Sequence, residues 1–367
     1  MALLAAACST PQPRTLPVGV LALMTGEFAD ASGVPTIEGA QLALETDSAG
    51  GRVRLDGRLY RVRLVLREHD DRPDAATTAA RALITQDSVV AIIGPQLSRH
   101  AIPAAIVAEN AGIPLISPMS SAPATTADHD WVFRLAYLDD AQGAALAMFA
   151  RQDLSATRAA VLYEASSQYS ARVAELFRAE FQRRGGHIVA NETFTGDATE
   201  SAAQWAHIRT GRPDVLLLPN FPQDVQRQVR AARAAGIRAT LLGGDTWDIP
   251  TMSNWDEVQH SFVAHQWRFG IALPESDRFV TNFQQRYGIK PRATAAMTYD
   301  AMGLLLDALR RAGSADPARI RDAIASTVNY HGATGTITFG GRHDPDRSVV
   351  ISTVRDSALQ VVRLVTP

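Results

Sequence analysis

Hydroxyl side chains at a helix start and in a nearby loop offer the clearest chemistry in this sequence. Gly94 to Ser98 and Ser117 to Ser121 each follow a short apolar run that predicts a buried strand. Ser98 also opens a helical stretch, so its hydroxyl and the free N–H groups of the first turn predict an anion site, where a ligand carboxylate would fit. The alternatives are that Ser98 is only a helix cap and that Ser121 is only a loop residue.

Motifs for catalysis, cofactors and metals are absent. The chain has no Gly-x-x-x-x-Gly-Lys loop, no Gly-x-Gly-x-x-Gly after a strand, no Gly-x-Ser-x-Gly elbow and no His-Glu-x-x-His. The 9 His are scattered, and the segments 69–71 and 343–346, which combine His with Asp, fall at strand ends or turns, where these residues are common. We therefore expect a protein that is not an enzyme and that binds no cofactor or metal. An enzyme is the weakest alternative.

The composition predicts a globular protein with two domains. The chain has 367 residues, 46% hydrophobic and 20% charged, which is too long for one typical domain. The net charge is −2, from 36 Lys+Arg against 38 Asp+Glu, so electrostatics give no case for nucleic acid as a partner. The single Cys excludes an intrachain disulfide.

Short apolar runs alternate with Ala-rich helical stretches along the first two thirds of the chain. This alternation predicts βαβ units and parallel sheets, and its two series predict two α/β lobes of the doubly wound kind. The expected strands are Val18–Met24, Tyr60–Leu66, Val89–Ile93, Ile113–Ile116, Ala159–Tyr163, His187–Phe194, Val215–Leu218 and Thr240–Leu242. The expected helices are Gly33–Ser48, Ala75–Thr85, Ser98–Asn110, Tyr169–Arg184, Glu200–Thr210 and Gln223–Ala235.

The last third of the chain is richer in helix. Three expected helices separate one strand from three short ones, which suggests that the chain returns to the first lobe before it ends in the second. The expected strands are Ser261–Trp267, Thr336–Phe339, Val349–Val354 and Leu359–Val365, and the expected helices are Ser276–Tyr287, Thr294–Ala312 and Pro317–Thr327.

Several motifs, taken together, resemble the leucine/isoleucine/valine-binding family of type I periplasmic binding proteins, the substrate-binding proteins of ABC transporters. Their order and spacing cover nearly the whole chain from Leu16. The motifs are Leu23 to Ala29 with Gly39-Ala40, Ala91 to Pro95 with Ser98, Ile113 to Pro123, Val132 to Arg134 with Asp139 to Gly143, Val161 to Tyr163 with Tyr169, Leu242 to Asp245, Tyr299 to Ala301 and Gly332 to Phe339.

The resemblance implies the type I periplasmic-binding-protein fold, with two doubly wound parallel-sheet lobes joined by three hinge crossovers. It places these crossings near Tyr137, Gln266 and Gly335. The first lobe would hold residues 16–137 and 267–335, and the second lobe residues 138–266 and 336–367. A ligand would lie in the cleft between them and be trapped by hinge closure, the form that the membrane permease reads.

The resemblance also assigns the head group of a ligand to particular residues. Ser98 and Ser121 would hold a carboxylate, and the Met119 carbonyl and the Ser121 hydroxyl would meet an ammonium. Asp245 falls where the family places an acid for that ammonium, and a buried ammonium needs such a partner. Asp245 could instead be a turn acid. Ser120 lies in the same matching loop.

Aromatic residues in the matching loops are candidates for the wall of a side-chain pocket, with core packing as the alternative. They are Phe28, Tyr169, Phe221 and Trp247. Three positions depart from the family pattern: Ser121 replaces a frequent Thr, Asp245 is one methylene shorter than the common Glu, and Tyr169 is followed by Ser rather than Gly. These departures keep an amino-acid head group and leave the ligand's side chain open.

Cys8 ends a short apolar run and precedes a polar, Pro-rich segment. This pattern resembles the processing site of a bacterial lipoprotein, in which the Cys is lipidated, and residues 1–15 would then be a signal and tether. No Lys or Arg precedes the run, and the run is shorter than a secretory core; a start codon assigned too far downstream would explain both. The alternative is an unstructured N-terminus with an incidental Cys.

We therefore expect an extracytoplasmic solute-binding protein of an ABC importer that binds a small amino-acid-type ligand. It would be periplasmic or at the cell surface, anchored by lipid at Cys8, monomeric, and partnered by an ABC permease. One alternative is an envelope ligand sensor of the same fold. Another is a binder of aromatic or aliphatic carboxylates that lack an ammonium.

Overall fold

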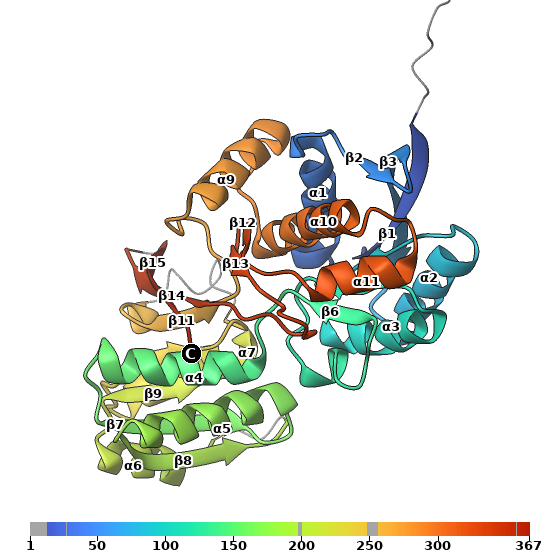
Figure 1. The fold of residues 1–367 in the computed structure, drawn as a ribbon. Coiled ribbons are helices and arrows are strands. Elements are labelled where there is room, and N and C mark those ends of the chain that lie inside the picture. Colours follow the sequence, from blue (N-terminus) through green and yellow to red (C-terminus); the bar gives the residue numbers. More distant parts are fainter. Residues whose placement is uncertain (1–12, 27, 197–199, 248–255, 357) are drawn as a thin grey trace, which may run out of the picture.

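Two separate β-sheets organise the chain into two α/β lobes (Figure 1). The computed structural model describes residues 13–26, 28–196, 200–247, 256–356 and 358–367. The first sheet has the strand order β2-β3-β1-β4-β5-β6, and the second has the order β15-β14-β11-β10-β9-β7-β8. Both contain a run of parallel strands joined through helices, so the α/β fold class predicted from the alternating pattern is confirmed.

The first sheet is parallel except for β2, which pairs antiparallel with β3. β4 and β5 are short and fully buried, and the second half of β1 is buried as well, as strands covered on both faces should be. Their bounds are β1 Arg14–Leu23, β2 Arg52–Leu55, β3 Arg58–His69, β4 Ile92–Ile93, β5 Leu115–Ser117 and β6 Val132–Arg134. The sequence did not predict β2 or β6, and β4 is shorter than expected.

Helices cover both faces of the first sheet. α1, α10 and α11 pack over one apolar core, while α2 and α3 close a second. A side chain at Gly39 of α1 would overlap the Ala295 carbonyl of α10, so these helices cross at a glycine. The bounds are α1 Ala29–Thr46, α2 Pro73–Thr85, α3 Ser98–Ala111, α9 Pro274–Tyr287, α10 Ala293–Ala312 and α11 Pro317–Ala325.

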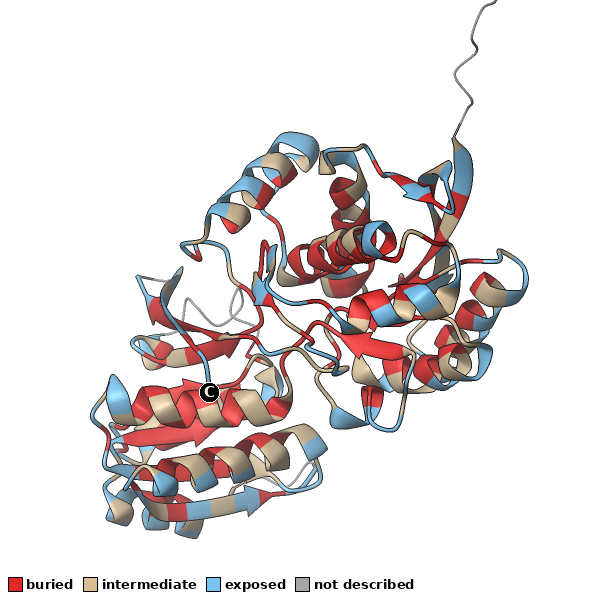
Figure 2. Ribbon diagram, viewed as in Figure 1, coloured by how far each residue is buried: buried red, intermediate tan, exposed pale blue. Residues whose placement is uncertain are grey.

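The second sheet is parallel through β8, β7, β9, β10 and β11, and the last two strands of the chain add an antiparallel edge. Buried residues line the sheet and the inner faces of its helices (Figure 2). The strands are β7 Arg158–Glu164, β8 His187–Phe194, β9 Val215–Leu218, β10 Thr240–Gly243, β11 Phe262–His265, β14 Val349–Arg355 and β15 Ala358–Val365. The helices are α4 Asp139–Gln152, α5 Gln168–Arg183, α6 Ala202–Gly211 and α7 Pro222–Ala234.

The chain passes between the lobes three times. The first passage joins β6 to α4, and the second joins β11 to α9. After α11, the short hairpin of β12 (Tyr330–Gly332) and β13 (Gly335–Ile337) belongs with the first lobe, and the third passage then leads to β14. Two 3₁₀ turns, η1 (Pro123–Thr125) and η2 (Asp256–Val258), complete the elements among the described residues.

The third passage comes later in the chain than Gly335, where the sequence placed it. Ile337 and Phe339 are fully buried in the core of the first lobe, and the His343 ring stacks on Phe133 at 4.7 Å between centroids. The passage therefore falls between Asp344 and the start of β14. The family resemblance placed this crossing near Gly335, and the apolar side chains that hold the following segment on the first lobe move it later in the chain.

Candidate ligand-binding site

Four candidate residues follow strands that flank the point where the strand order of a sheet reverses. In the first sheet the order reverses beside β1, between β3 and β4, and in the second it reverses beside β7, between β8 and β9. The loops at the carboxyl ends of strands flanking such a reversal diverge and leave room for a ligand. Phe28 follows β1 and Ser98 follows β4, while Tyr169 follows β7 and Phe221 follows β9.

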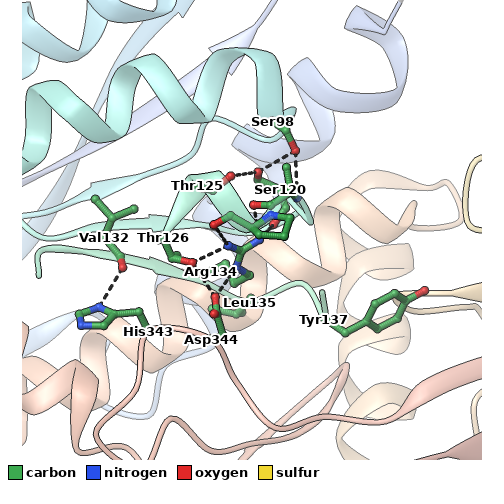
Figure 3. Close-up of polar contacts among 12 residues, drawn as sticks. Ser98, Ser120, Thr125, Thr126, Val132, Arg134, Leu135, Tyr137, His343 and Asp344 are labelled. Carbon is green, nitrogen blue, oxygen red and sulfur yellow. Dashed lines mark hydrogen bonds and ion pairs between the residues drawn. The ribbon is translucent and has the colours of Figure 1, made fainter. Parts of the chain in front are cut away.

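Ser98 is the first residue of α3, not its cap. Leu97 holds the cap position without a side-chain hydrogen bond, which leaves the Ser98 hydroxyl for other partners. That hydroxyl lies 2.8 Å from the Ser120 hydroxyl and 3.4 Å from the Ala122 backbone nitrogen (Figure 3). Ser120 is buried and also contacts Thr125 Oγ1 at 2.5 Å. The structure thus brings Ser98 and Ser120 together, and the contacts of Ser120 with Ser98 and Thr125 connect the loop after β5 to the start of α3.

Arg134, at the end of β6, supports the same loop. Its guanidinium donates to the carbonyls of Ser120 at 3.2 Å, Ala122 at 2.7 Å and Pro123 at 3.0 Å (Figure 3). Its Nε donates to Asp344 at 2.5 Å. Full burial lowers the pKa of Arg134 from its ordinary value, and the Asp344 carboxylate opposes that shift. Arg134 therefore holds the Ser-rich loop by its backbone, a role that the sequence did not predict.

Asp245 follows β10 and lies among polar side chains of the second lobe. Its Oδ1 accepts a hydrogen bond from the Tyr169 hydroxyl at 3.0 Å, and its Oδ2 accepts one from Gln266 Nε2 at 3.2 Å. The Tyr169 hydroxyl also reaches Gln142 Oε1 at 2.6 Å. A side chain at Gly244 would overlap this hydroxyl, so the close approach needs glycine. Burial raises the pKa of Asp245, and the hydrogen bonds from its neighbours oppose that rise.

Asp139 is a second acid that sequence reasoning did not single out. It is the first residue of α4, is 4% exposed, and has an Oδ1 with no hydrogen-bond partner among the described residues. Burial and the nearby Asp245 carboxylate raise its pKa to about 7, while a hydrogen bond from Ser121 and the charge of Arg134 oppose the rise. Asp139 therefore connects the Ser-rich loop of the first lobe with the acid of the second.

A signal for Asp139 was present in the sequence. Two consecutive acids, Asp139 and Asp140, directly follow the first crossing expected near Tyr137. Asp140 is bound by Arg172 of α5 at 2.6 Å. Asp139 turns into the protein instead, and nothing in the local pattern distinguishes these two neighbours.

The four aromatic candidates separate into two groups. Tyr169 and Phe221 are half-buried, and their ring centroids lie 5.9 Å apart. Phe28 is also half-buried and lies under the Arg99 guanidinium at 5.3 Å. Trp247 packs in the core of the second lobe, 2% exposed, and its indole N–H donates to the Leu218 carbonyl at 2.9 Å. The expectation that Trp247 walls a ligand pocket gives way to the alternative of core packing.

Comparison with known proteins identifies the family. A family model described as periplasmic binding protein matches residues 15–358. The chain belongs to the periplasmic binding protein family. Membership places this periplasmic binding protein outside the cytoplasm, and confirms the family predicted from the motifs. The family is one of solute-binding proteins.

Individual relatives of this periplasmic binding protein agree with the fold. An amino acid binding protein of Pseudomonas aeruginosa is 26% identical over 314 residues, 84% of this chain and 82% of its own length. The crystal structure of a leucine-binding protein from Thermotoga maritima is 29% identical, with a TM-score of 0.80 over 96% of this chain and 99% of its own. A solute-binding protein of R. palustris in complex with benzoate is 21% identical, with a TM-score of 0.75 over 96% and 97%. These structures confirm the type I fold.

The part of this periplasmic binding protein that the structure describes contains neither a membrane-spanning helix nor a metal cluster. Within the described ranges, no helix has the length and apolar character needed to cross a bilayer. The same residues contain no group of three or more His, Cys, Asp or Glu side chains arranged to hold a metal ion. Cys8 lies outside the described residues.

Proposed function

We propose that this chain is the solute-binding protein of an ABC importer and that it binds a small amino acid between its lobes. The observation that carries the proposal is that hydrogen-bond donors for an anion and carboxylates for a cation lie on different sides of the lobe junction. Hydroxyls and a helix N-terminus in the first lobe suit a carboxylate, and two buried acids, Asp139 and Asp245, suit an ammonium. The relatives named for amino acids and leucine support the same ligand class.

The carboxylate would bind at the start of α3. The Ser98 hydroxyl and the first backbone N–H groups of that helix are donors with the right polarity, because the N-terminal end of a helix carries partial positive charge. Ser121 would add its hydroxyl from the neighbouring loop. The Met119 carbonyl is an acceptor and would instead meet the ammonium, while its half-buried side chain packs against the core of the first lobe.

The ammonium would bind beside Asp139 and Asp245. Burying either carboxylate without a cation is costly, which is why the pKa of each is raised. The unpartnered Oδ1 of Asp139 is the free acceptor, whereas both oxygens of Asp245 already accept hydrogen bonds. An ammonium here would compensate both carboxylate charges. Binding is then favoured because it offsets the cost of burying these charges without a cation, as well as by the new contacts.

The lobes would close on the ligand. The proposed first lobe holds residues 16–137 and 267–346, and the second holds 138–266 and 347–367. Because the carboxylate donors lie in the first lobe and Asp245 lies in the second, a single ligand can stabilise a closed form only by touching both. The aromatic pair Tyr169 and Phe221 would face the ligand's side chain.

A carboxylate without an ammonium is the second candidate ligand. The half-buried rings of Tyr169 and Phe221 favour it, since they place aromatic side chains at the carboxyl ends of β7 and β9. The R. palustris neighbour is in complex with benzoate. For such a ligand the two buried acids would have to be protonated.

Calorimetry with the 20 common L-amino acids and benzoate tests the proposal. Asp245→Asn and Asp139→Asn should each weaken the best amino acid by about 30- to several-thousand-fold, equal to about 2–5 kcal/mol, since each leaves an ammonium short of a partner. Ser98→Ala should cost about 1–3 kcal/mol, because backbone N–H groups still bind the carboxylate. Asp140→Asn is the matched control on the same turn and should leave binding unchanged. If no amino acid binds, but benzoate binds the wild type and both aspartate variants equally, the amino-acid proposal is wrong.

We further propose that the protein works as a monomer, partnered by an ABC permease and anchored by lipid at Cys8. The first described strand begins at Arg14, so a short tether would link the anchor to the first lobe. Acyl chains bind membranes by about 0.8 kcal/mol per buried CH₂, so two or more chains hold a protein stably. Expressed with an upstream leader, the wild type should sediment with membranes, and Cys8→Ser should be released. A wild type already free in the periplasm contradicts the anchor.

A further inference from the structure

Arg347 lies at the junction of the lobes, where it contacts the first and second passages and the β12–β13 turn of the first lobe. It is itself part of the third passage, directly before β14. One guanidinium nitrogen, Nη1, donates to the Leu135 carbonyl of the first passage at 2.6 Å. The other, Nη2, donates to the Gln266 carbonyl of the second passage at 3.3 Å and to the Thr334 carbonyl at 3.0 Å.

The turn that Arg347 contacts is itself fixed by a buried acid. Asp300 of α10 accepts hydrogen bonds from the backbone nitrogens of Ala333 and Thr334, both at 2.7 Å, and from the Thr334 hydroxyl at 2.5 Å. The carboxylate of Asp300 also attracts the Arg347 charge. Burial lowers the pKa of Arg347 to about 10 and raises the pKa of Asp300 to about 6, so both charges persist near neutral pH.

Gln266 extends this network to the candidate site. Its backbone carbonyl accepts from Arg347, its Oε1 accepts from the Tyr137 backbone nitrogen at 3.0 Å, and its Nε2 donates to Asp245 Oδ2 at 3.2 Å. The side chain is 2% exposed, so these bonds are shielded from water. The second passage is therefore bonded to the first, to the third and to the acid beyond β10.

We propose that Arg347 is the positioning residue of the hinge: it fastens the three passages into one unit and, through Gln266, sets the orientation of Asp245. A fork of donors is required for this task, because the carbonyls belong to three separate segments and a single nitrogen cannot reach them all. Without the cross-link each passage can twist independently, and the lobes lose a defined relative orientation. This inference rests on the two-lobe fold and does not depend on which ligand binds.

Electron spin resonance distance measurement on the protein without ligand tests the hinge directly. Spin labels would be attached at Thr78→Cys of α2 and Ala179→Cys of α5, both exposed and one in each lobe, with Cys8→Ser removing the only natural Cys. The wild type should give a narrow distribution of interlobe distances. Arg347→Met should broaden it, and Arg347→Lys should broaden it as well, because lysine keeps the charge but not the fork.

A matched control separates hinge loosening from general destabilisation. Arg233 donates to the carbonyls of Ile237 and Ala239, both at 3.0 Å, and to that of Glu257 at 3.4 Å, all within the second lobe. Arg233→Met should lower thermal stability yet keep the narrow distribution.

The test also covers a variant that does not fold. If Arg347→Met is unfolded by circular dichroism, Arg347→Lys carries the experiment, since lysine keeps the buried charge and removes only the fork of donors. A folded Arg347→Met or Arg347→Lys protein with the wild-type distribution overturns the proposal. So does broadening of equal size in Arg233→Met.

Discussion

The buried Asp139 carboxylate lowers the stability of the folded protein when it is ionised, so replacing it should stabilise the protein at high pH. Its carboxylate is buried beside Asp245, and its pKa is about 7. In an unfolded chain the same group has a pKa of about 3.9. The folded state therefore binds more protons between these two values, and the stability contributed by this group falls as the pH rises from about 4 to about 7. We predict that Asp139→Asn removes this loss.

The size of the effect follows from the two pKa values. A difference of about 3 units at 1.36 kcal/mol per unit gives about 4 kcal/mol that the wild type loses above pH 7. The pKa of about 7 is the net result of burial, the Asp245 charge, the Arg134 charge and the Ser121 hydrogen bond, so the loss of the last two in the asparagine variant is already contained in this figure. The variant should therefore exceed the wild type by about 4 kcal/mol at about pH 8 and match it near pH 4, where Asp139 is protonated.

Urea unfolding, followed by circular dichroism at one-unit steps from about pH 4 to pH 8, measures this difference. Comparing variant with wild type at each pH cancels the contribution of Asp300, whose pKa is also raised. Asp140→Asn is the control: it removes a neighbouring charge and the ion pair with Arg172, and should lower stability by about 0–1 kcal/mol. If Asp139→Asn is less stable than the wild type at pH 8, or if the difference is the same at both ends of the range, the reasoning is refuted.

Three further substitutions test the packing beneath the site. Arg134→Met should lower the unfolding free energy by about 3–5 kcal/mol in urea, because the buried arginine supports several loop carbonyls; a loss under 1 kcal/mol would contradict this role. Gly244→Ala should weaken ligand binding by about 10-fold or more in calorimetry, because the new methyl group overlaps the Tyr169 hydroxyl. Such overpacking costs about 1–3 kcal/mol. Unchanged affinity would show that Tyr169 can move freely. Gly39→Ala should lower thermal stability by a similar energy, about 1–3 kcal/mol, by separating α1 from α10 at the Ala295 carbonyl, and an unchanged midpoint would mean that the helices shift at no cost.

Local patterns predicted most of the elements. The strands 187–194 and 215–218 have the predicted bounds, and the helices beginning at Ser98 and Pro317 begin where the sequence placed them. In each case an apolar run or a helical period is bounded by a turn residue, and the signal is local. α4 was not predicted as a helix, although eight of its residues are buried. Its alanine-rich sequence has no clear apolar stripe, and it is held by packing against α5.

The loops that follow the strands were the predictable part of the candidate site. Ser98, Tyr169, Phe221 and Asp245 each directly follow a predicted strand or open a predicted helix, and the structure places all four at carboxyl ends of parallel strands. Trp247 satisfied the same rule and packs in the core instead. Proximity to a strand end fixes the edge of the sheet but not whether a side chain turns inward.

The α/β class, the two series of elements, the family and the loops that could meet a ligand could all be predicted from the sequence, because each depends on periodicity or on short motifs. The folded chain was needed to show that the Asp245 carboxylate lies close enough to Asp139 to raise its pKa, and that Arg347 in the third passage binds carbonyls of the other two. The residues of these pairs are separated by 106, 212 and 81 positions, and the energies of their interactions are set by burial and distance. The desolvation penalty of a carboxylate arises only when the folded lobes exclude water from it, and a local sequence pattern cannot predict that burial.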